Sequence, residues 1–175
     1  MFTLETARLR FRELVMDDFP EATPLILDEP VLSRMEPKFA SALAYHWMKK
    51  KLEQYTSLGY SHWHVSLKET GAFVGIIGVA PETVEDVPYI GLGYMVRREF
   101  RRQGMAFEGA RACLEWAFGN LTAGKIIAEI AEDNLASRAL AEKLGMTLER
   151  IYPRFNGEEK VPYCFYSIAS DTFCP

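Results

Sequence analysis

The change of hydrophobic period between Tyr89 and Phe118 constrains the fold of this 175-residue chain more than any other feature. The apolar run YIGLGYMV has the composition of a buried strand, whereas the residues from about Gln103 onward repeat at the spacing of an amphipathic helix. A second apolar run, GKIIAEIA, follows the helix. Because a strand, a helix and a strand in succession form a crossover, this pattern predicts that the two strands pair in parallel.

Segments on either side of this unit predict further strands and helices. RLRFREL, YSHWHVSL, AFVGIIGVA, MTLERIYPRF and VPYCFYSIA are strand-like. The polar stretch PETVEDVP is expected to be a connection, whose acids Glu82, Glu85 and Asp86 are solvated or attract a cationic substrate. The predicted order is strand, two helices, three strands, helix, strand, helix and two strands. The fold class is therefore α+β, with a mixed, mostly antiparallel sheet of about seven strands and about four helices.

Composition limits the class of protein. No repeat, low-complexity run or linker-like stretch interrupts the chain, so residues 1–175 are expected to form one domain. A net charge of −4 argues against a nucleic-acid-binding face, and no stretch is apolar and long enough to suggest a membrane partner. The N-terminus is charged, and the three cysteines lack metal-ligand spacing. These features favour a reduced, cytoplasmic location.

A basic loop between the strand and the helix is a candidate anion site. Four arginines stand within residues 97–102, where Glu99 is the only acid, so the local charge is +3. A helix N-terminus offers unpaired N–H donors and a partial positive charge, and Gly104 and the small Ala106 would let a ligand approach the backbone. The alternative is a solvated basic surface beside a glycine that only begins a helix. Neither the nucleoside-triphosphate P-loop sequence nor the dinucleotide fingerprint is present, so a different phosphate-bearing ligand is expected.

Four segments together resemble one protein family. RRQGMA, residues 101–106, resembles the R/Q-x-x-G-x-G/A motif of the GNAT acyltransferases. LETARLRFREL with MDDF, NLASRALAEKLGM and RFNGEEKVPYCFYSI resemble, in order, parts of the subgroup that acetylates ribosomal-protein N-termini. The resemblance covers nearly the whole chain. It implies a GNAT-like fold whose central parallel strand pair is splayed for the co-substrate acetyl-CoA, and acetyl transfer to a primary amine by direct attack on the thioester.

The resemblance also implies the residues of the site. The loop backbone would bind pyrophosphate, and the end of the preceding strand would pair with pantetheine and polarise the thioester carbonyl. Asn134 would contact pantetheine, with a helix cap as the alternative; Ser137 would be a proton donor near the departing sulfur, or only a small residue at a helix contact. The expected acetyl-CoA-binding residues are Tyr94, Met95, Val96, Arg101, Arg102, Gln103, Gly104, Met105, Ala106 and Asn134, and the candidate catalytic residue is Ser137.

Two positions depart from the family pattern. Gly91 stands where many relatives have a glutamate, and Ala141 stands where others have a tyrosine that acts as general acid. Proton transfer would then use water, Ser137, or an acid elsewhere, such as Glu129 or Glu149. The acceptor would be a protein N-terminus, or a small amine such as an aminoglycoside or a polyamine, and a homodimer is left open. A module that binds acyl-CoA without catalysis is the alternative from another functional class.

Three further side chains receive structural interpretations. His62 and His64 share one face of a predicted strand, but two histidines without placed carboxylates are too few to indicate a metal site. No metal is expected, and the two rings are expected to line the sheet or a substrate cleft. Cys113 lies beside the apolar stripe of its helix. It is expected to be a buried thiol.

Overall fold

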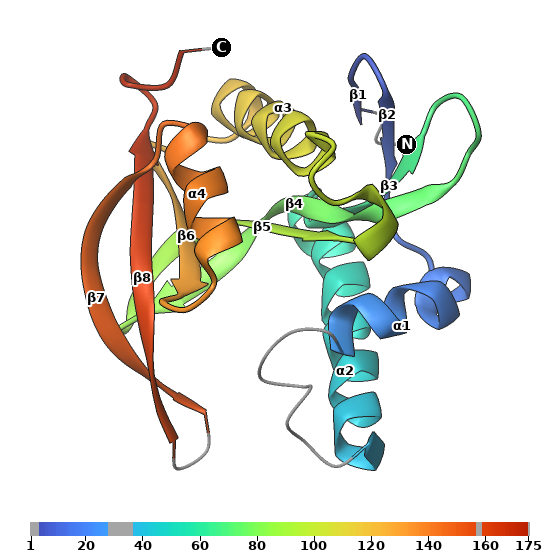
Figure 1. Ribbon diagram of the computed structural model, residues 1–175, viewed down its shortest axis with the longest axis horizontal. Helices are drawn as coiled ribbons and strands as arrows, with labels where there is room; N and C mark the ends of the chain where they lie inside the picture. The colour runs from blue at the N-terminus through green and yellow to red at the C-terminus, as the bar shows by residue number, and fades with distance from the viewer. Residues whose placement is uncertain (1–3, 28–36, 157–158, 175) are drawn as a thin grey trace.

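An eight-stranded sheet forms the framework of the protein (Figure 1). The computed structural model describes residues 4–27, 37–156 and 159–174. The strands are β1 (Leu4–Glu5), β2 (Leu9–Arg12), β3 (His62–Leu67), β4 (Phe73–Val84), β5 (Val87–Val96), β6 (Lys125–Ala131), β7 (Thr147–Asn156) and β8 (Glu159–Ala169). The helices are α1 (Phe19–Leu27), α2 (Pro37–Leu58), α3 (Met105–Asn120) and α4 (Leu135–Lys143). The spatial order of the strands is β1-β2-β3-β4-β5-β6-β8-β7.

The sheet opens at its one parallel junction. β5 and β6 pair in parallel, as the strand–helix–strand pattern predicts, but their ladder contains only the pairs Ile90↔Ile126 and Gly91↔Ile127. Beyond Gly91, β5 continues beside β4 as far as Val96, while β6 stays paired with β8. In Figure 1 β5 accordingly runs across the view, and β6 and β8 stand nearly upright. The sheet thus divides into two halves that separate from Gly91 onward.

Both faces of the central strands are covered by helices. The neighbours Ile76 and Ile77 on β4 point to opposite faces, and both are buried. Ile77 belongs to the cluster packed under α3, whereas Ile76 belongs to the cluster under α1 and α2. Gly109 lets α3 approach closely, because a Cβ at that position would lie 2.6 Å from Cδ1 of Ile77. Cys113 is fully buried in the same core, as the sequence predicts.

The polar stretch PETVEDVP is not a loop, and this expectation is wrong. β4 and β5 run through it and are joined by a two-residue turn at Glu85 and Asp86, whose φ angles are 50° and 64°. Two consecutive positive φ angles are typical of the tight turn that matches the twist of a hairpin. Glu82 therefore lies in a strand. The short β1 adds an eighth strand to the seven expected.

The helix boundaries agree with the sequence signals at glycines. Gly104 precedes α3 and Gly145 follows α4, with φ angles of 79° and 86° that L-amino acids with a Cβ rarely adopt. Within the described ranges, no helix combines the length and the apolar character that crossing a membrane would need.

Candidate functional site

The start of α3 presents backbone donors at the end of β5. The first hydrogen bond that closes the helix runs from the Glu108 N–H to the Gly104 carbonyl, 3.0 Å apart, so the N–H groups of residues 105–107 have no carbonyl partner within the helix. Arg102 and Gly104 both have positive φ angles, of 61° and 79°. Such alternation folds the loop tightly and turns successive N–H groups toward one side. The local geometry thus suits an anion.

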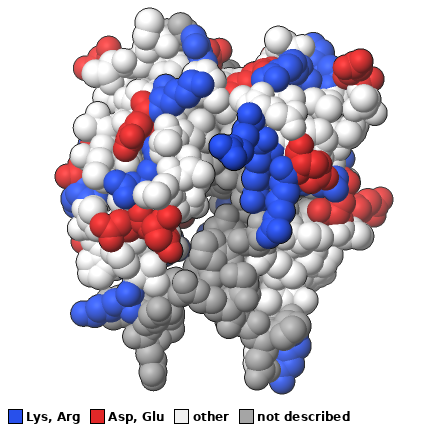
Figure 2. Space-filling view, viewed as in Figure 1, with Lys and Arg blue, Asp and Glu red and all other residues white. Residues whose placement is uncertain are grey.

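Only part of the arginine charge is available to a ligand. Arg97 forms an ion pair with Glu99, 2.7 Å apart, and Nε of Arg101 donates to the Val96 carbonyl at 2.7 Å. Arg102 is exposed. Figure 2 shows Lys and Arg side chains gathered near the centre of this face, around the region where β5 leads toward α3 in Figure 1. The loop is basic, although less so than the count of arginines suggests.

Arg8 on the first hairpin supports the loop from outside. Its guanidinium forms an ion pair with Glu108 of α3 at 2.6 Å and donates from Nη1 to the Gln103 carbonyl at 3.1 Å. The Gln103 amide donates back to the Glu99 carbonyl at 2.6 Å. These bonds tie the loop to the first hairpin and engage the Gln103 side chain within the loop itself. No sequence signal links Arg8 to this loop, because the two are about a hundred residues apart.

A cavity of about 700 Å³, here called the loop cavity, lies between this loop, the end of β5 and α4. Ten of the eleven predicted site residues line it, and Gln103 does not. Phe100, Phe107, Leu140 and Lys143 also line it and were not predicted. Phe107 belongs to the apolar stripe of α3, whose period indicates a core position, so the sequence gives no sign of its second role.

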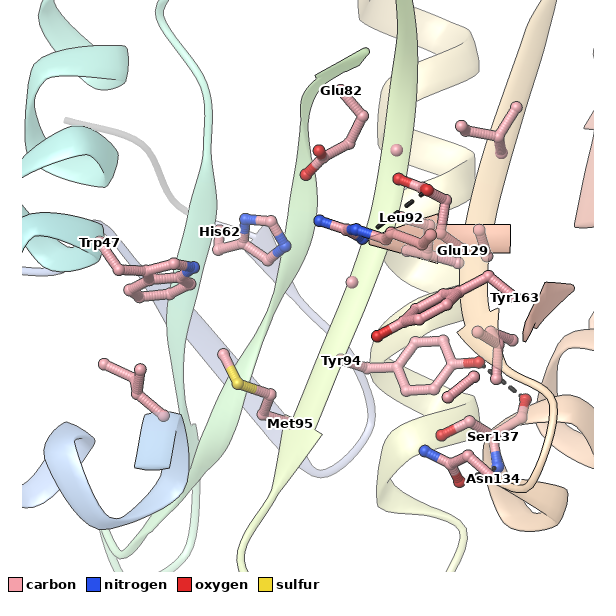
Figure 3. Close-up of a pocket in the computed structure, with 18 of the residues that line it drawn as sticks. Trp47, His62, Glu82, Leu92, Tyr94, Met95, Glu129, Asn134, Ser137 and Tyr163 are labelled. Carbon is pink, nitrogen blue, oxygen red and sulfur yellow. Dashed lines mark hydrogen bonds and ion pairs between the residues drawn. The ribbon is translucent and has the colours of Figure 1, made fainter. Parts of the chain in front are cut away.

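A smaller cavity of about 290 Å³, here called the sheet cavity, opens where β5 and β6 separate (Figure 3). Tyr94, Met95, Asn134 and Ser137 line both cavities, which therefore meet at these four residues. The Tyr94 hydroxyl donates to the Ser137 carbonyl at 2.9 Å. The Ser137 N–H donates to Oδ1 of Asn134 at 3.2 Å, so Asn134 is the N-cap of α4 as well as a lining residue. A ligand that occupies the loop cavity can meet a second ligand in the sheet cavity at this junction.

Two glycines of β5 make room for side chains from neighbouring strands. A Cβ on Gly91 would lie 2.4 Å from Cγ of Glu82 on β4, and a Cβ on Gly93 would lie 2.3 Å from Nε2 of His62 on β3. Figure 3 shows both side chains beside β5, with the Glu82 carboxylate directed into the cavity on the side of His62. The expectation that Glu82 is a solvated loop residue is therefore wrong. It is a half-buried cavity residue.

Lys51 of α2 is a buried cation in the sheet cavity. It is 3% exposed, and within the described part of the chain it has neither a hydrogen bond nor an ion pair. Its ammonium lies 5.2 Å from the centroid of the Trp47 ring. Burial lowers the pKa of Lys51 to about 8, against the opposing effect of the Glu82 charge. Burial, and then the charge of Lys51, also hold the pKa of His62 well below its usual value, so its imidazole is neutral.

The two other acids proposed from the sequence, Glu129 and Glu149, differ in whether they line a cavity. Glu129 of β6 lines the sheet cavity, accepts a hydrogen bond from the Tyr152 hydroxyl and lies 3.7 Å from Nη1 of Arg154. Burial raises the pKa of Glu129, and the charge of Arg154 opposes that shift. Glu149 lines neither cavity and forms an ion pair with Lys125 at 2.7 Å. Of these two acids, only Glu129 lines a cavity of the site.

Ala141 and His64 line neither cavity. Ala141 is fully buried in the core and offers no polar group to either cavity. His64 stacks on Phe73, with ring centroids 4.6 Å apart, and lies 3.2 Å from Glu21. The one grouping of possible metal ligands found among the described residues is Asp18, Glu21 and His64, and it excludes His62. Both oxygens of Asp18 accept hydrogen bonds from Arg12, at 2.6 and 2.7 Å, so a cation there would face a guanidinium.

Comparison with known proteins identifies related chains. Residues 8–147 match the family described as "Acetyltransferase (GNAT) domain". The uncharacterized protein YkkB of Bacillus subtilis (strain 168) is 33% identical over 159 residues, which cover 87% of this chain and 90% of YkkB. A putative GnaT-family acetyltransferase from Bordetella pertussis has a TM-score of 0.81 at 18% identity, covering 97% of this chain and all of that one. The spermidine N-acetyltransferase of Vibrio cholerae, solved with CoA and spermine, has a TM-score of 0.74 at 15% identity, covering 95% and 98%.

Proposed function

Because this chain belongs to the GNAT acetyltransferase family, whose co-substrate is acetyl-CoA, we propose that it transfers an acetyl group to a primary amine at the junction of the two cavities. The observation that carries the proposal is the meeting of the loop cavity and the sheet cavity at Tyr94, Met95, Asn134 and Ser137. One cavity begins at unpaired helix N–H donors and suits pyrophosphate. The other ends among titratable groups and suits an amine.

The residues of the loop cavity fit acetyl-CoA. The N–H groups of residues 105–107 and the exposed Arg102 offer positive potential to the pyrophosphate. Beyond Gly91, the edge of β5 that turns away from β6 can pair with the amide groups of pantetheine as an added strand would. Asn134 lies at the junction to contact the pantetheine arm, and the Ser137 hydroxyl can give a proton to the departing thiolate. The thioester supplies the activated acetyl group.

The acceptor must arrive as a neutral amine. A protein α-amino group has a pKa of about 7.7–8.0, whereas the pKa of a lysine amine is about 10.4. Deprotonating the α-amino group therefore costs roughly 3.4 kcal/mol less free energy. A protein N-terminus therefore needs less help from a base than a lysine or a polyamine does. A small amine is the second candidate acceptor, and the sheet cavity, at about 290 Å³, has room for a chain of a few atoms.

The test combines CoA binding with turnover. Isothermal titration with CoA should show binding, and thiol release from acetyl-CoA should appear with at least one amine in a panel of N-terminal peptides, polyamines and aminoglycosides. Binding without release from any acceptor would instead indicate a non-catalytic acyl-CoA-binding module. Absence of CoA binding would contradict both functions.

A matched pair of glycine variants tests the loop cavity. Gly104→Glu places a side chain where φ is 79° and adds a negative charge at the proposed phosphate site, so CoA binding should be lost while the circular dichroism spectrum is retained. Gly119→Glu is the control, because Gly119 lies in the same helix and its Cβ would meet nothing within 4 Å. Retained affinity in Gly104→Glu would show that the loop is not the phosphate site.

A further inference from the structure

The sheet cavity contains a carboxylate at the place where β5 has no side chain. Gly91 offers only hydrogen at its α-carbon, and the space for its Cβ is filled by Glu82, whose Cγ and Cβ lie 2.4 and 3.3 Å from that point. The register explains this overlap. Ala80 is opposite Gly91 and Glu82 is opposite Tyr89, so Glu82 is the diagonal neighbour of Gly91 on the same face.

We infer that Glu82 is the proton acceptor for the attacking amine, supplied by β4 because β5 has a glycine at position 91. This inference rests on the proposed acetyl transfer and adds the residue that takes up the proton lost by the amine nitrogen as the new bond forms. The Glu82 carboxylate lines the sheet cavity and, within the described ranges, has no hydrogen bond or ion pair that would occupy it. It is therefore available to an amine or to a bridging water.

The proton balance of the step is simple. The lone pair of the neutral amine forms the new N–C bond at the thioester carbonyl, and the C–S bond breaks with its electron pair leaving on sulfur. The amine nitrogen loses one proton, which the Glu82 carboxylate accepts directly or through a water molecule. The thiolate takes one proton either from water or from the Ser137 hydroxyl, which regains a proton from solvent. Glu82 returns its proton to solvent, so both groups recover their starting states. No other reactant is consumed.

The other titratable groups of the cavity are less suited to this role. Lys51 has a pKa of about 8, so most Lys51 side chains are ammonium ions at pH 7, which attract a carboxylate and have no lone pair to accept a proton. Protonation of His62 would create a buried cation beside Lys51, and both burial and that charge lower its pKa. Glu129 is engaged by the Tyr152 hydroxyl and by Arg154. Glu82, in contrast, lines the sheet cavity with no hydrogen bond or ion pair to another described residue.

The first experiment compares two carboxylates of one hairpin. Glu82→Gln should lower kcat for the best acceptor in the panel by about a hundredfold or more, which is the usual contribution of a general base, with the Kd for CoA unchanged within about twofold. Glu85→Gln is the matched control, because Glu85 is exposed at the turn and lines neither cavity. It should keep the wild-type kcat.

The second experiment moves the carboxylate back to β5. Glu82→Ala removes the Cγ that a side chain at position 91 would strike, so Gly91→Glu in that background should recover at least tenfold of the kcat that Glu82→Ala loses. A purely structural role of Glu82 would not produce this rescue. Undiminished kcat in Glu82→Gln, or a double variant no faster than Glu82→Ala, would overturn the inference. Absent CoA binding or turnover in the wild-type protein would overturn the proposed function itself, so the two failures are distinguishable.

Discussion

Lys51→Met is expected to stabilise the protein, and to do so more at pH 7 than at pH 9.5. The desolvated ammonium has a pKa of about 8 in the folded protein, compared with 10.5 for an unperturbed lysine. That shift of about 2.5 units corresponds to roughly 3 kcal/mol of lost stability when the group is charged. Methionine has a similar length and no charge, so it can occupy the same space beside Trp47 without the desolvation cost.

The direction of the pH dependence follows from the number of protons that Lys51 binds in the folded and unfolded states. Because the folded pKa is the lower one, the unfolded chain binds more protons at Lys51 between pH 8 and 10.5, and stability rises with pH across that window. The destabilisation is complete below pH 8 and is gone above 10.5. The variant should therefore gain about 2–3 kcal/mol at pH 7 and only about 1 kcal/mol at pH 9.5. The variant also loses the cation–π contact between Lys51 and Trp47, which reduces the expected gain at pH 7 toward about 2 kcal/mol.

Urea denaturation of the wild type and the variant at both pH values measures the two differences. Lys50→Met serves as the control, because Lys50 is exposed on the same helix and its removal should change stability by less than about 0.5 kcal/mol at either pH. An equal gain at pH 7 and pH 9.5, or a loss at pH 7, would refute the reasoning. It would mean that the Lys51 ammonium is solvated or paired with an anion in solution.

Three further variants, at two positions, test capping and packing. Asn134→Ala should cost about 0.5–2 kcal/mol in urea denaturation, because it removes the cap on the Ser137 N–H, whereas Asn134→Ser should keep most of that stability. If the Asn134 amide also contacts pantetheine, the serine variant should still bind CoA more weakly in titration; unchanged affinity would leave only the cap. Gly109→Val should lower stability by about 1–3 kcal/mol or more, because its side chain would press on Ile77, and a midpoint equal to wild type would contradict the close approach of α3 to β4.

Local sequence signals predicted the elements that depend on local physics. The helical period after Gln103 and the glycine at position 104 indicated the start of α3, and the structure has its N-cap there with a positive φ. A cap of α4 at Asp133 or Asn134 is likewise expected from the sequence, and the structure has it at Asn134. The cavity positions of Asn134 and Ser137 were expected only from the family resemblance. These predictions succeed because a cap, a turn or a helix N-terminus involves residues close together in the chain.

The prediction of a polar connection at PETVEDVP was wrong because the turn between the two strands is only two residues long. Polar residues and a proline at either end suggest a loop, yet β4 and β5 extend through them. The turn needs only Glu85 and Asp86, because the hydrogen bonds of a long, twisted hairpin outweigh the weak strand preference of its polar residues.

The order of elements from β2 onward, the basic loop before α3 and the resemblance to the GNAT family could all be predicted from patterns along the chain. The position of the Glu82 carboxylate in the sheet cavity depends instead on how the strands pair. The two-residue turn sets the register of β4 against β5, and that register places Glu82 across the empty position of Gly91. A side chain that reaches over a glycine on another strand leaves no pattern along the chain, because the contact depends on strand pairing and not on sequence spacing.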